Sequence, residues 1–326
     1  MQHLRIGIIG VGGMGTFHAN TLGDLADVSI AAVSDPHLPN AEAVSDRHGA
    51  AIVDDPFELI RSDEIDALVI ASPDDTHAGL ALAALERGLP TLCEKPLATT
   101  VEDARSVVEA EVALGRRLIQ LGFMREYDPA HRQLVAALAE LGRIDHVRAF
   151  HRNANTTRRT LEAIIVQSMV HDVHSVRFLT GAEITSVHVS GAGADDGSFR
   201  HIGALCRLSD GAHAFVEFDD GGFAYEVGVE VLTRTGDALT SPPTRAIRRH
   251  DGSVDVHLGT DWFGWFADAY RNQDQAWVTS IRAGEPTGPS TWDGYRSQQV
   301  VGAIRRSLDE QITVPIEIEE PPPLYR

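Results

Sequence analysis

Short apolar runs alternate with stretches of helical periodicity through the first 123 residues, and this alternation limits the possible fold more than any other feature. Apolar runs of this length are typical of strands buried on both faces of a sheet. Gly88 and Gly115 follow two of the helical stretches, at the position where helices commonly end. Strands that alternate with helices predict a parallel, doubly wound α/β sheet with helices on both faces. The expected strands cover residues 4–9, 29–33, 67–71, 91–93 and 118–121, and the expected helices cover residues 14–22, 39–48, 76–87 and 100–114.

The pattern changes from Gly142 onward, where apolar stretches are separated by Gly and Asp turns. Such spacing is typical of an antiparallel sheet. One uncovered face of an open antiparallel sheet is normally buried against a second copy of the chain. We therefore expect an α+β domain that forms a homo-oligomer, either a dimer or a tetramer. Its expected strands cover residues 147–151, 184–190, 201–208, 212–218 and 225–233, and its expected helices cover residues 162–178, 261–283 and 292–308.

The end of the chain carries two further patterns. Residues 319–326 contain three consecutive prolines, which predict an extended arm and no helix. The change of pattern near Gly142 predicts two domains: a doubly wound α/β domain over 1–123, and an α+β domain that carries the oligomer contacts over 124–326. Four aromatic residues at helical spacing predict a stripe that faces the core: Trp262, Phe266, Tyr270 and Trp277.

Composition excludes several classes of partner. The formal net charge is −19, and both nucleic acid and anionic membranes require clustered basic residues, so we expect neither as a partner. No apolar run approaches the roughly 20 residues that span a bilayer. The strand that starts at Leu4 leaves no room for a signal peptide, and two cysteines, Cys93 and Cys206, are too few for a disulfide framework. These observations predict a cytoplasmic protein.

A glycine-rich turn follows the first expected strand and opens the first expected helix. Gly10, Gly12 and Gly15 fit G-x-G-x-x-G: the first glycine allows the tight turn, the second admits a pyrophosphate, and the third lets the helix pack close to the strand. Backbone N–H groups at the helix start, which includes Gly13 and Met14, would face the phosphates. In this strand–turn–helix context, the motif predicts a dinucleotide site.

Asp35 ends the second expected strand, 20 residues beyond Gly15. A carboxylate at this position can hydrogen-bond both ribose hydroxyls of an adenosine and would repel a 2′-phosphate. No arginine follows closely, since the next residues are Pro36, His37 and Leu38. The sequence therefore predicts NAD, and NADP is less favoured.

Ser72 and Pro73 follow the expected strand at 67–71, at the edge of the sheet where ligands collect. His77 stands in the first turn of the next expected helix. Two interpretations of His77 stay open at this stage: contact with the cofactor, or an exposed histidine near a helix start.

Lys95 is the only lysine, and the other 27 of the 28 basic residues are arginine. Where a chain otherwise uses arginine for positive charge, a retained lysine indicates a need for a compact ammonium that can release its proton. The alternative is a lysine on a solvated turn that has no function. We favour chemistry at Lys95, because perturbed lysines belong mainly to active sites.

Taken together, these residues resemble the glucose-fructose oxidoreductase/inositol dehydrogenase family of NAD(P)-dependent enzymes, most closely its inositol dehydrogenase branch. The resemblance covers nearly the whole chain. The segments that carry it are the glycine motif, Ser72-Pro73 with His77, Glu94-Lys95-Pro96-Leu97, the segment 122–129, His151-Arg152-Asn153, the helix around 266–270 and Asp293-Gly294.

The resemblance implies roles for individual residues. Lys95 would lie between nicotinamide and substrate and contact the hydroxyl that is oxidised, and Glu94 would belong to the cofactor site. Arg125, His151 and Asn153 would contribute to a polyol pocket. The alternatives are a domain-interface ion pair for Arg125 and a polar pair at a strand end for His151 and Asn153.

The family's second catalytic motif, D-x-x-x-H, corresponds here to Gln167 and His171, so the aspartate has become glutamine. Positions i, i+4 and i+7 share one face of an α-helix, so Gln167, His171 and His174 are expected to face one cleft. Asp172 cannot simply replace the missing carboxylate, because adjacent residues point about 100° apart around a helix. We interpret His171 as the acid/base and Gln167 as a positioning group. His171 and His174 lack a third ligand at suitable spacing, so no metal is expected.

These residues predict an NAD-dependent oxidoreductase that transfers hydride between nicotinamide and a secondary alcohol or ketone of a cyclitol or sugar, with Lys95 and His171 as acid/base pair. Histidines, Asn153, Gln167 and one arginine favour a neutral, hydroxyl-rich substrate. Two alternatives stay open: an epimerase, eliminase or glycoside-cleaving enzyme that uses NAD transiently, and a non-catalytic NAD-sensing regulator.

Overall fold

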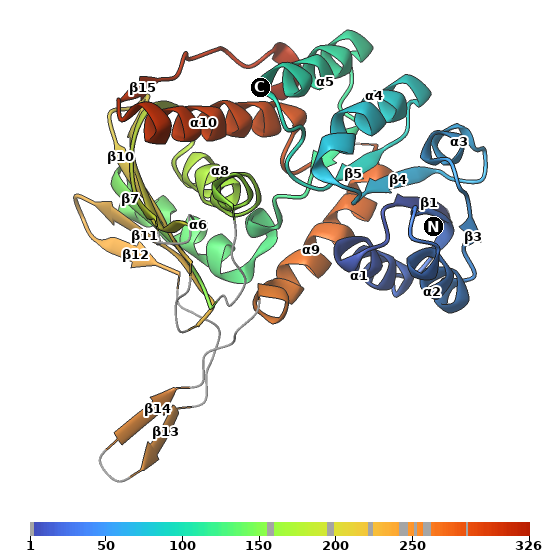
Figure 1. The fold of residues 1–326 in the computed structure, drawn as a ribbon, viewed down its shortest axis with the longest axis horizontal. Coiled ribbons are helices and arrows are strands. Elements are labelled where there is room, and N and C mark those ends of the chain that lie inside the picture. Colours follow the sequence, from blue (N-terminus) through green and yellow to red (C-terminus); the bar gives the residue numbers. More distant parts are fainter. Residues whose placement is uncertain are drawn as a thin grey trace. The chain divides into compact units, whose positions relative to one another are not determined.

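The computed structural model describes residues 3–154, 160–193, 199–220, 224–240, 247–250, 253–256, 262–284 and 286–326. The chain forms two compact units (Figure 1). The first unit comprises Met1–Met124, Tyr270–Gln298 and Glu320–Arg326, and the second comprises Arg125–Ala269 and Gln299–Glu319.

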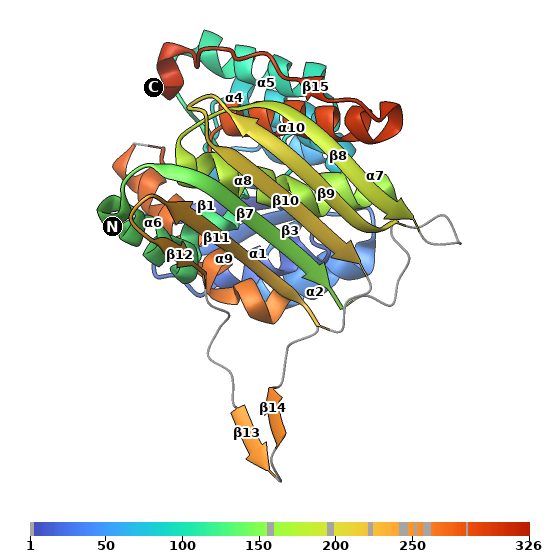
Figure 2. The ribbon, with the colours of Figure 1, turned by 90° about the vertical axis from the view of Figure 1, so that its left-hand side faces the viewer.

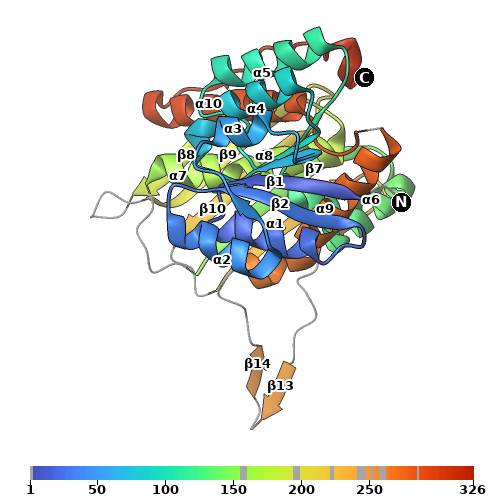
Figure 3. The same cartoon turned by 90° about the vertical axis from the view of Figure 1, so that its right-hand side faces the viewer.

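The first unit contains a six-stranded parallel sheet in the order β3-β2-β1-β4-β5-β6. The strand order reverses between β1 and β4, which makes the carboxyl edge beside these strands the expected ligand site. The helices lie on both faces, with α1 and α2 on one and α3, α4 and α5 on the other (Figures 1 and 3). The strands are β1 (Leu4–Ile9), β2 (Val28–Ser34), β3 (Ala51–Ile52), β4 (Ala67–Ile70), β5 (Thr91–Cys93) and β6 (Ile119–Leu121). The helices are α1 (Gly13–Gly23), α2 (Leu38–His48), α3 (Pro56–Arg61), α4 (His77–Arg87) and α5 (Val101–Leu114).

The predicted doubly wound α/β fold is confirmed, and all nine expected elements are present within two residues of the predicted ends. Two elements, β3 and α3, were not predicted, because a two-residue strand and a six-residue helix are too short to show periodicity. Asp55 caps α3 by accepting a hydrogen bond from the Phe57 N–H at 2.9 Å.

The first unit also includes late segments of the chain. Helix α9 (Trp262–Ala283) places Trp277 and Val278 in the same core cluster as Ile6 and Ile8 of β1. The domain boundary predicted after residue 123 placed these C-terminal segments in the second domain, whereas Tyr270–Gln298 and Glu320–Arg326 belong to the first unit. Burial of Trp277, which is only 2% exposed, in this core cluster explains why the C-terminal half of α9 belongs to the first unit.

The second unit is built on a seven-stranded sheet in the order β12-β11-β7-β10-β9-β8-β15 (Figure 2). All neighbouring pairs are antiparallel except β7 and β10, which confirms the expected mostly antiparallel α+β fold. Helix α8 packs on the face of the sheet turned away from the viewer in Figure 2. The strands are β7 (Ile144–Asn153), β8 (Ile184–Gly193), β9 (Phe199–Leu208), β10 (His213–Asp220), β11 (Glu226–Thr233), β12 (Asp237–Leu239) and β15 (Val314–Pro315); β13 (Ile247–His250) and β14 (Ser253–Val256) form a separate hairpin.

The helices of the second unit differ from the prediction in two ways. Helix α6 (Pro129–Leu141) was missed, although Asp128 caps it and Pro129 starts it. The helix expected at 162–178 is interrupted: α7 (Leu161–Ile164) leads into a π-helical turn, η3 (Ile165–Met169), and then into α8 (Val170–Thr180). A π-turn adds a residue to the turn, so α-helical spacing does not hold across it.

The C-terminal tail joins the first unit. It includes a short 3₁₀ turn (Pro323–Tyr325), so it is not the fully extended arm that was expected. The Tyr325 hydroxyl lies 2.9 Å from Glu111 Oε2 and 2.8 Å from Thr291 Oγ1, and its ring stacks on Trp292. Thr291 begins helix α10 (Thr291–Glu310), so the tail is fixed to both α5 and α10.

Phe266, Tyr270 and Trp277 are buried, which confirms the expected aromatic stripe for these three residues. The Trp262 side chain lies outside the described residues. Among the helices that the structure describes, none is long and apolar enough to cross a membrane.

Candidate active site

The glycine turn lies between β1 and α1, beside the switch point of the first unit. Gly10 has φ +82°, and a Cβ there would lie 2.5 Å from the Ser72 backbone. A Cβ at Gly15 would lie 1.8 Å from the Gly10 carbonyl oxygen. At Gly12 and Gly13, by contrast, an added Cβ would meet no described atom within 4 Å. The turn is therefore closed where helix and strand pack, and open where a phosphate would approach the backbone.

The start of α1 suits an anion. Gly12 is its N-cap, no described side chain caps it, and no acidic residue stands in its first turn. The first backbone N–H groups of a helix carry partial positive charge and lack partners within the helix. A pyrophosphate can supply those partners, so the residues at this turn fit a dinucleotide.

Asp35 lies at the end of β2 and faces the glycine turn. Its Oδ2 accepts a hydrogen bond from the Val11 N–H at 2.7 Å, and its Oδ1 accepts one from the His37 N–H at 2.8 Å. These contacts fix the orientation of the carboxylate. Each oxygen keeps a second lone pair that can accept from a ribose hydroxyl.

His77 is buried, with 1% of its surface exposed, so the alternative of an exposed histidine is wrong. Its Nδ1 lies 2.7 Å from the Pro96 carbonyl oxygen, and its Nε2 lies 2.9 Å from the Ser72 carbonyl oxygen. Both partners are backbone carbonyl oxygens, so the ring contacts one acceptor on each of two turns. His77 therefore ties the turn after β4 to the turn after β5, and contact with the cofactor stays a prediction.

Lys95 is half-buried on the turn that follows β5, and the Lys95-Pro96 peptide bond is cis. Glu94 is 6% exposed, and its Oε2 accepts a hydrogen bond from the Lys95 N–H at 3.2 Å. Space beside the Glu94 carboxylate is tight, because a Cβ at Gly122 would lie 2.8 Å from it. The backbone of the turn is thus held by a buried carboxylate.

That carboxylate belongs to what we call the Glu94 cluster: His18, Thr21, Glu94 and Asp274. His18 Nε2 lies 3.1 Å from Glu94 Oε1, while its Nδ1 lies 2.9 Å and 3.1 Å from the two Asp274 oxygens. The Thr21 hydroxyl donates to Asp274. His18, Glu94 and Asp274 are all buried.

The Glu94 cluster contains a buried imidazolium. Burial alone would lower the pKa of His18, but the charges and hydrogen bonds of Asp274 and Glu94 raise it to about 10. Burial likewise acts to raise the pKa of Glu94, but His18, Lys95 and His77 hold that pKa below its ordinary value. A cation is therefore shared by two carboxylates, one from α9 and one from the lysine turn.

In the second unit, the Asp172 cluster consists of Arg125, His151 and Asp172. Arg125 Nη1 donates to Asp172 Oδ1 at 2.5 Å, and His151 Nδ1 lies 3.4 Å from Asp172 Oδ2. Asp172 is fully buried and the other two are nearly so. Burial acts to raise the pKa of Asp172, but the charges of Arg125 and His151 hold it below its ordinary value.

The structure brings together two of the predicted pocket residues, since Arg125 Nη2 lies 3.5 Å from His151 Nδ1. His151 also makes edge-on contacts with the rings of Phe218 and Tyr225. Asn153 is half-buried at the last residue of β7, two residues further along the same strand. The Asp172 cluster thus fixes the orientation of a guanidinium and an imidazole at this end of the strand.

Gln167, His171 and His174 do not share the α-helical spacing that the sequence analysis assumed. Gln167 lies in the π-turn η3 and is exposed, whereas His171 and His174 lie in α8 and are buried. His174 Nε2 lies 2.8 Å from Glu126 Oε1. Lys95 belongs to the first unit and His171 to the second, so their pairing stays a prediction.

No motif in the sequence predicts a role for His18 or Asp274. Both interrupt apolar helical faces: His18 stands among the buried residues Gly15, Ala19 and Leu22 of α1, and Asp274 stands between Tyr270 and Trp277. A polar residue on an apolar face is the signal that could have identified them.

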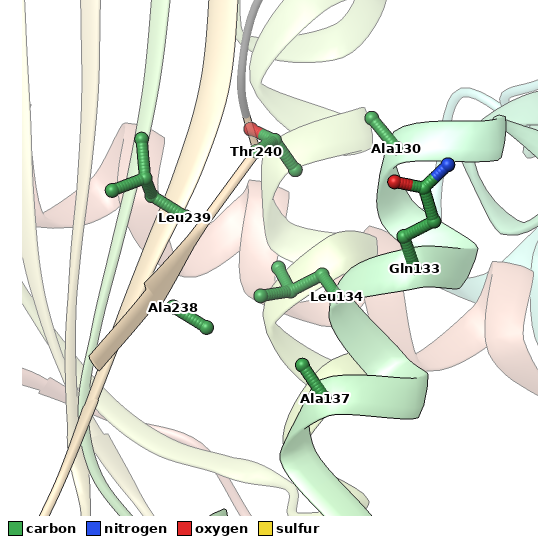
Figure 4. A pocket seen from close by; sticks show the side chains of 7 residues that line it. All are labelled: Ala130, Gln133, Leu134, Ala137, Ala238, Leu239 and Thr240. Atoms are coloured by element: carbon green, nitrogen blue, oxygen red, sulfur yellow. The ribbon is translucent and has the colours of Figure 1, made fainter. Parts of the chain in front are cut away.

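Two further features bear on ligand binding. Within the described ranges, no group of three or more His, Cys, Asp or Glu side chains is arranged to hold a metal. A pocket between α6 and β12 contains none of the predicted site residues (Figure 4). It is lined by Ala130, Gln133, Leu134, Ala137, Ala238, Leu239 and Thr240.

Residues 4–123 match the oxidoreductase family with an NAD-binding Rossmann fold. The chain is 38% identical to an inositol 2-dehydrogenase from Rubrobacter xylanophilus, and the alignment covers 100% of this chain and 96% of that relative. The chain belongs to this oxidoreductase family. It is also 38% identical to inositol 2-dehydrogenase 2 from Saccharopolyspora erythraea, over 99% of this chain and 98% of that relative.

Solved structures agree with this assignment. The fold matches that of myo-inositol dehydrogenase from Lactobacillus casei, crystallised with NAD(H) and myo-inositol, with a TM-score of 0.96 and 29% identity over 100% of both chains. The resemblance to the glucose-fructose oxidoreductase/inositol dehydrogenase family is thereby confirmed. The chain is an NAD-dependent oxidoreductase of the type that acts on CH–OH groups.

Proposed function

We propose that this oxidoreductase is a cyclitol dehydrogenase, which interconverts a secondary alcohol of an inositol-like ring and the corresponding ketone. The observation that carries the proposal is the placement of the only lysine, on an anchored turn at the carboxyl edge of the sheet and one strand from the switch point. Relatives along the whole chain are inositol 2-dehydrogenases, which supports this substrate class.

The first unit would hold the cofactor. The open backbone at Gly12 and Gly13 and the start of α1, including Met14, would bind the pyrophosphate. Asp35 would accept hydrogen bonds from the adenosine ribose, which favours NAD over NADP. The wall of the cofactor site on the nicotinamide side would be formed or supported by Ser72, Pro73, His77 and Glu94. When bound, the cofactor supplies the hydride acceptor or donor.

Lys95 would hydrogen-bond to the reacting oxygen and stabilise the negative charge that develops there. The compact ammonium suits this role, because it can approach one oxygen closely and can exchange its proton. His171 would accept the proton from that oxygen and return it in the reverse direction. Gln167 would orient a hydroxyl through its amide, since it has no proton to exchange.

The second unit would bind the remaining hydroxyls through Arg125, His151 and Asn153. Arg125 is already paired with Asp172 at 2.5 Å, so its charge is largely neutralised before a substrate binds. A phosphorylated ligand would need unpaired basic groups, whereas the N–H groups of a paired guanidinium suit neutral hydroxyls. This favours a free cyclitol or sugar. We further propose a cytoplasmic enzyme that assembles as a homodimer or homotetramer.

The test is to follow absorbance at 340 nm with NAD and NADP in parallel, against inositol isomers, aldoses and the corresponding ketones. We expect reduction of NAD by at least one inositol isomer, and a higher kcat/KM with NAD than with NADP. Turnover of aldoses alone would contradict the cyclitol assignment. Conversion of substrate with no net NADH would contradict the dehydrogenase assignment and indicate transient use of the cofactor.

A further inference from the structure

We propose that His18 is a positioning residue for Lys95, holding the turn that carries the lysine against the helix that begins at the glycine turn. The inference rests on the proposed function, because it assigns a support to the lysine of that site. His18 lies in α1 and Glu94 lies directly before Lys95, so their contact joins the cofactor helix to the lysine turn.

Geometry makes this connection specific. Both nitrogens of the His18 ring are engaged: Nε2 lies 3.1 Å from Glu94, and Nδ1 lies 2.9 Å from Asp274. The two contacts lie on opposite sides of a ring with no exposed surface. The other Glu94 oxygen receives the Lys95 N–H at 3.2 Å. A short chain of contacts therefore runs from Asp274 through His18 and Glu94 to the Lys95 backbone.

A second histidine holds the opposite side of the turn. His77 lies 2.7 Å from the Pro96 carbonyl oxygen. His77 acts on the backbone after Lys95, whereas His18 acts through Glu94 on the backbone before it. Loss of either contact frees one side of the turn. Unlike His77, His18 reaches the turn through a carboxylate, so its role can be tested together with that partner.

The charges that face His18 agree with a supporting role. They come from Asp274 of α9 and Glu94 of the lysine turn, and Lys95 and His77 in turn face Glu94. The remaining neighbours are the Thr21 hydroxyl, through Asp274, and the rings of Phe17 and Tyr270. A buried imidazolium among these groups keeps Glu94 ionised, so that its oxygen stays an acceptor for the Lys95 N–H.

The first test is kinetic. His18→Gln should lower kcat by about tenfold or more, because small misplacements of a catalytic group can cost about 10²-fold in rate. The Kd for NAD should change by less than about threefold, since the glycine turn and Asp35 are untouched. His131→Gln is the matched control, because His131 is also buried and also paired, with Asp128 at 2.7 Å, but lies in the second unit.

A double-mutant cycle identifies the route of the effect. Glu94→Gln keeps the size of the side chain and removes its charge. If His18 acts through Glu94, the double variant should have about the kcat of the worse single variant, whereas independent roles would multiply the two losses. Multiplied losses, or an unchanged kcat in His18→Gln, would overturn the inference.

The last test requires no turnover. Because Lys95 is the only lysine, trinitrobenzenesulfonate modifies one side chain, and peptide mapping separates it from the N-terminal amine. The Lys95 labelling rate should rise about threefold or more in His18→Gln, because a freed turn samples more exposed states. An unchanged or lower rate would overturn the inference. If the wild type oxidises no polyol, the proposed function fails, while the labelling comparison still decides the role of His18.

Discussion

The Glu94 cluster of the first unit holds one buried cation between two carboxylates, whereas the Asp172 cluster of the second unit holds one buried carboxylate against a guanidinium and an imidazole. In the first, the paired cation is His18, and the lysine proposed for chemistry lies one residue beyond the cluster. In the second, Asp172 is the buried support, and the basic groups it holds are those proposed to bind substrate. In each cluster, a fully buried ionised group orients a less buried residue proposed to act.

The largest expected effect comes from the residue that the Glu94 cluster supports. Lys95→Ala should lower kcat by about 10²- to 10⁴-fold, the usual contribution of a positioned acid/base group. Measured by fluorescence titration, the Kd for NAD should stay close to that of the wild type. Lys95→Arg should also be poor, because arginine is bulkier and stays protonated. Normal turnover in Lys95→Ala would show that Lys95 has no catalytic role and that the Glu94 cluster does not serve catalysis through it.

The central carboxylate of the Asp172 cluster should dominate stability. Asp172→Asn leaves Arg125 buried without its counter-charge, so the free energy of unfolding should fall by about 3–5 kcal/mol. Urea denaturation measures this loss. The matched control is Asp145→Asn, since Asp145 pairs with Arg234 at 3.8 Å on the surface and should change stability by less than about 1 kcal/mol. Equal losses in the free energy of unfolding of both variants would show that burial does not decide how much each ion pair contributes to stability.

The two clusters should lose their contributions to stability at opposite ends of the pH scale. Folding raises the pKa of His18 from 6.5 to about 10, so its contribution is complete below pH 6.5 and is lost as pH rises toward 10. Folding lowers the pKa of Asp172 from 3.8, so its contribution is present above pH 3.8 and is lost as pH falls.

This difference can be measured by urea denaturation of the wild type and His18→Gln between pH 6.5 and pH 9. The stability advantage of the wild type should shrink as pH rises. Burial raises the pKa of the Cys93 and Cys206 thiols above their ordinary value of 9.0, and their effect cancels because both proteins contain them. A constant advantage across this range would contradict an imidazolium at His18.

The smallest expected effect concerns Gln167, which lies outside both clusters. Gln167→Asp should change the free energy of unfolding by no more than about 0.5 kcal/mol, because the side chain is exposed. If Gln167 faces the acid/base His171, the new carboxylate should raise the pKa of that imidazole and move the acid limb of the kcat profile to higher pH. An unchanged profile would place Gln167 away from His171.

Sequence patterns predicted the elements whose signal is local. The ends of β1 and β5 match the expected ranges, because each is a short apolar run with clear limits. The π-turn at Ile165–Met169 was missed, since nothing in its composition distinguishes it from an α-helix. The Glu94 cluster was missed for another reason: His18 and Asp274 stand 256 residues apart, and no local pattern pairs them.

The candidate site residues also differ in this way: some have a local sequence signal, and others depend on tertiary packing. The glycine motif, Asp35 and Lys95 could be predicted as site residues because each has a fixed place relative to a strand. His77 was identified, but its burial was not, since its two carbonyl partners come from turns 19 and 5 residues away. Asp172 was excluded as a replacement for the missing aspartate only because of its direction on the helix. Its pairing with Arg125 depends on tertiary packing, which the sequence does not show.

The first unit includes part of α9 and the C-terminal tail. It therefore cannot fold completely until the end of the chain has been synthesised. Trp277 and Val278 share one buried cluster with apolar side chains of β1 and β2, which leave the ribosome long before them. Until Trp277 and Val278 emerge, that apolar surface depends on chaperones or on a transient arrangement. For the same reason, a fragment ending at residue 123 would expose this surface to water and aggregate.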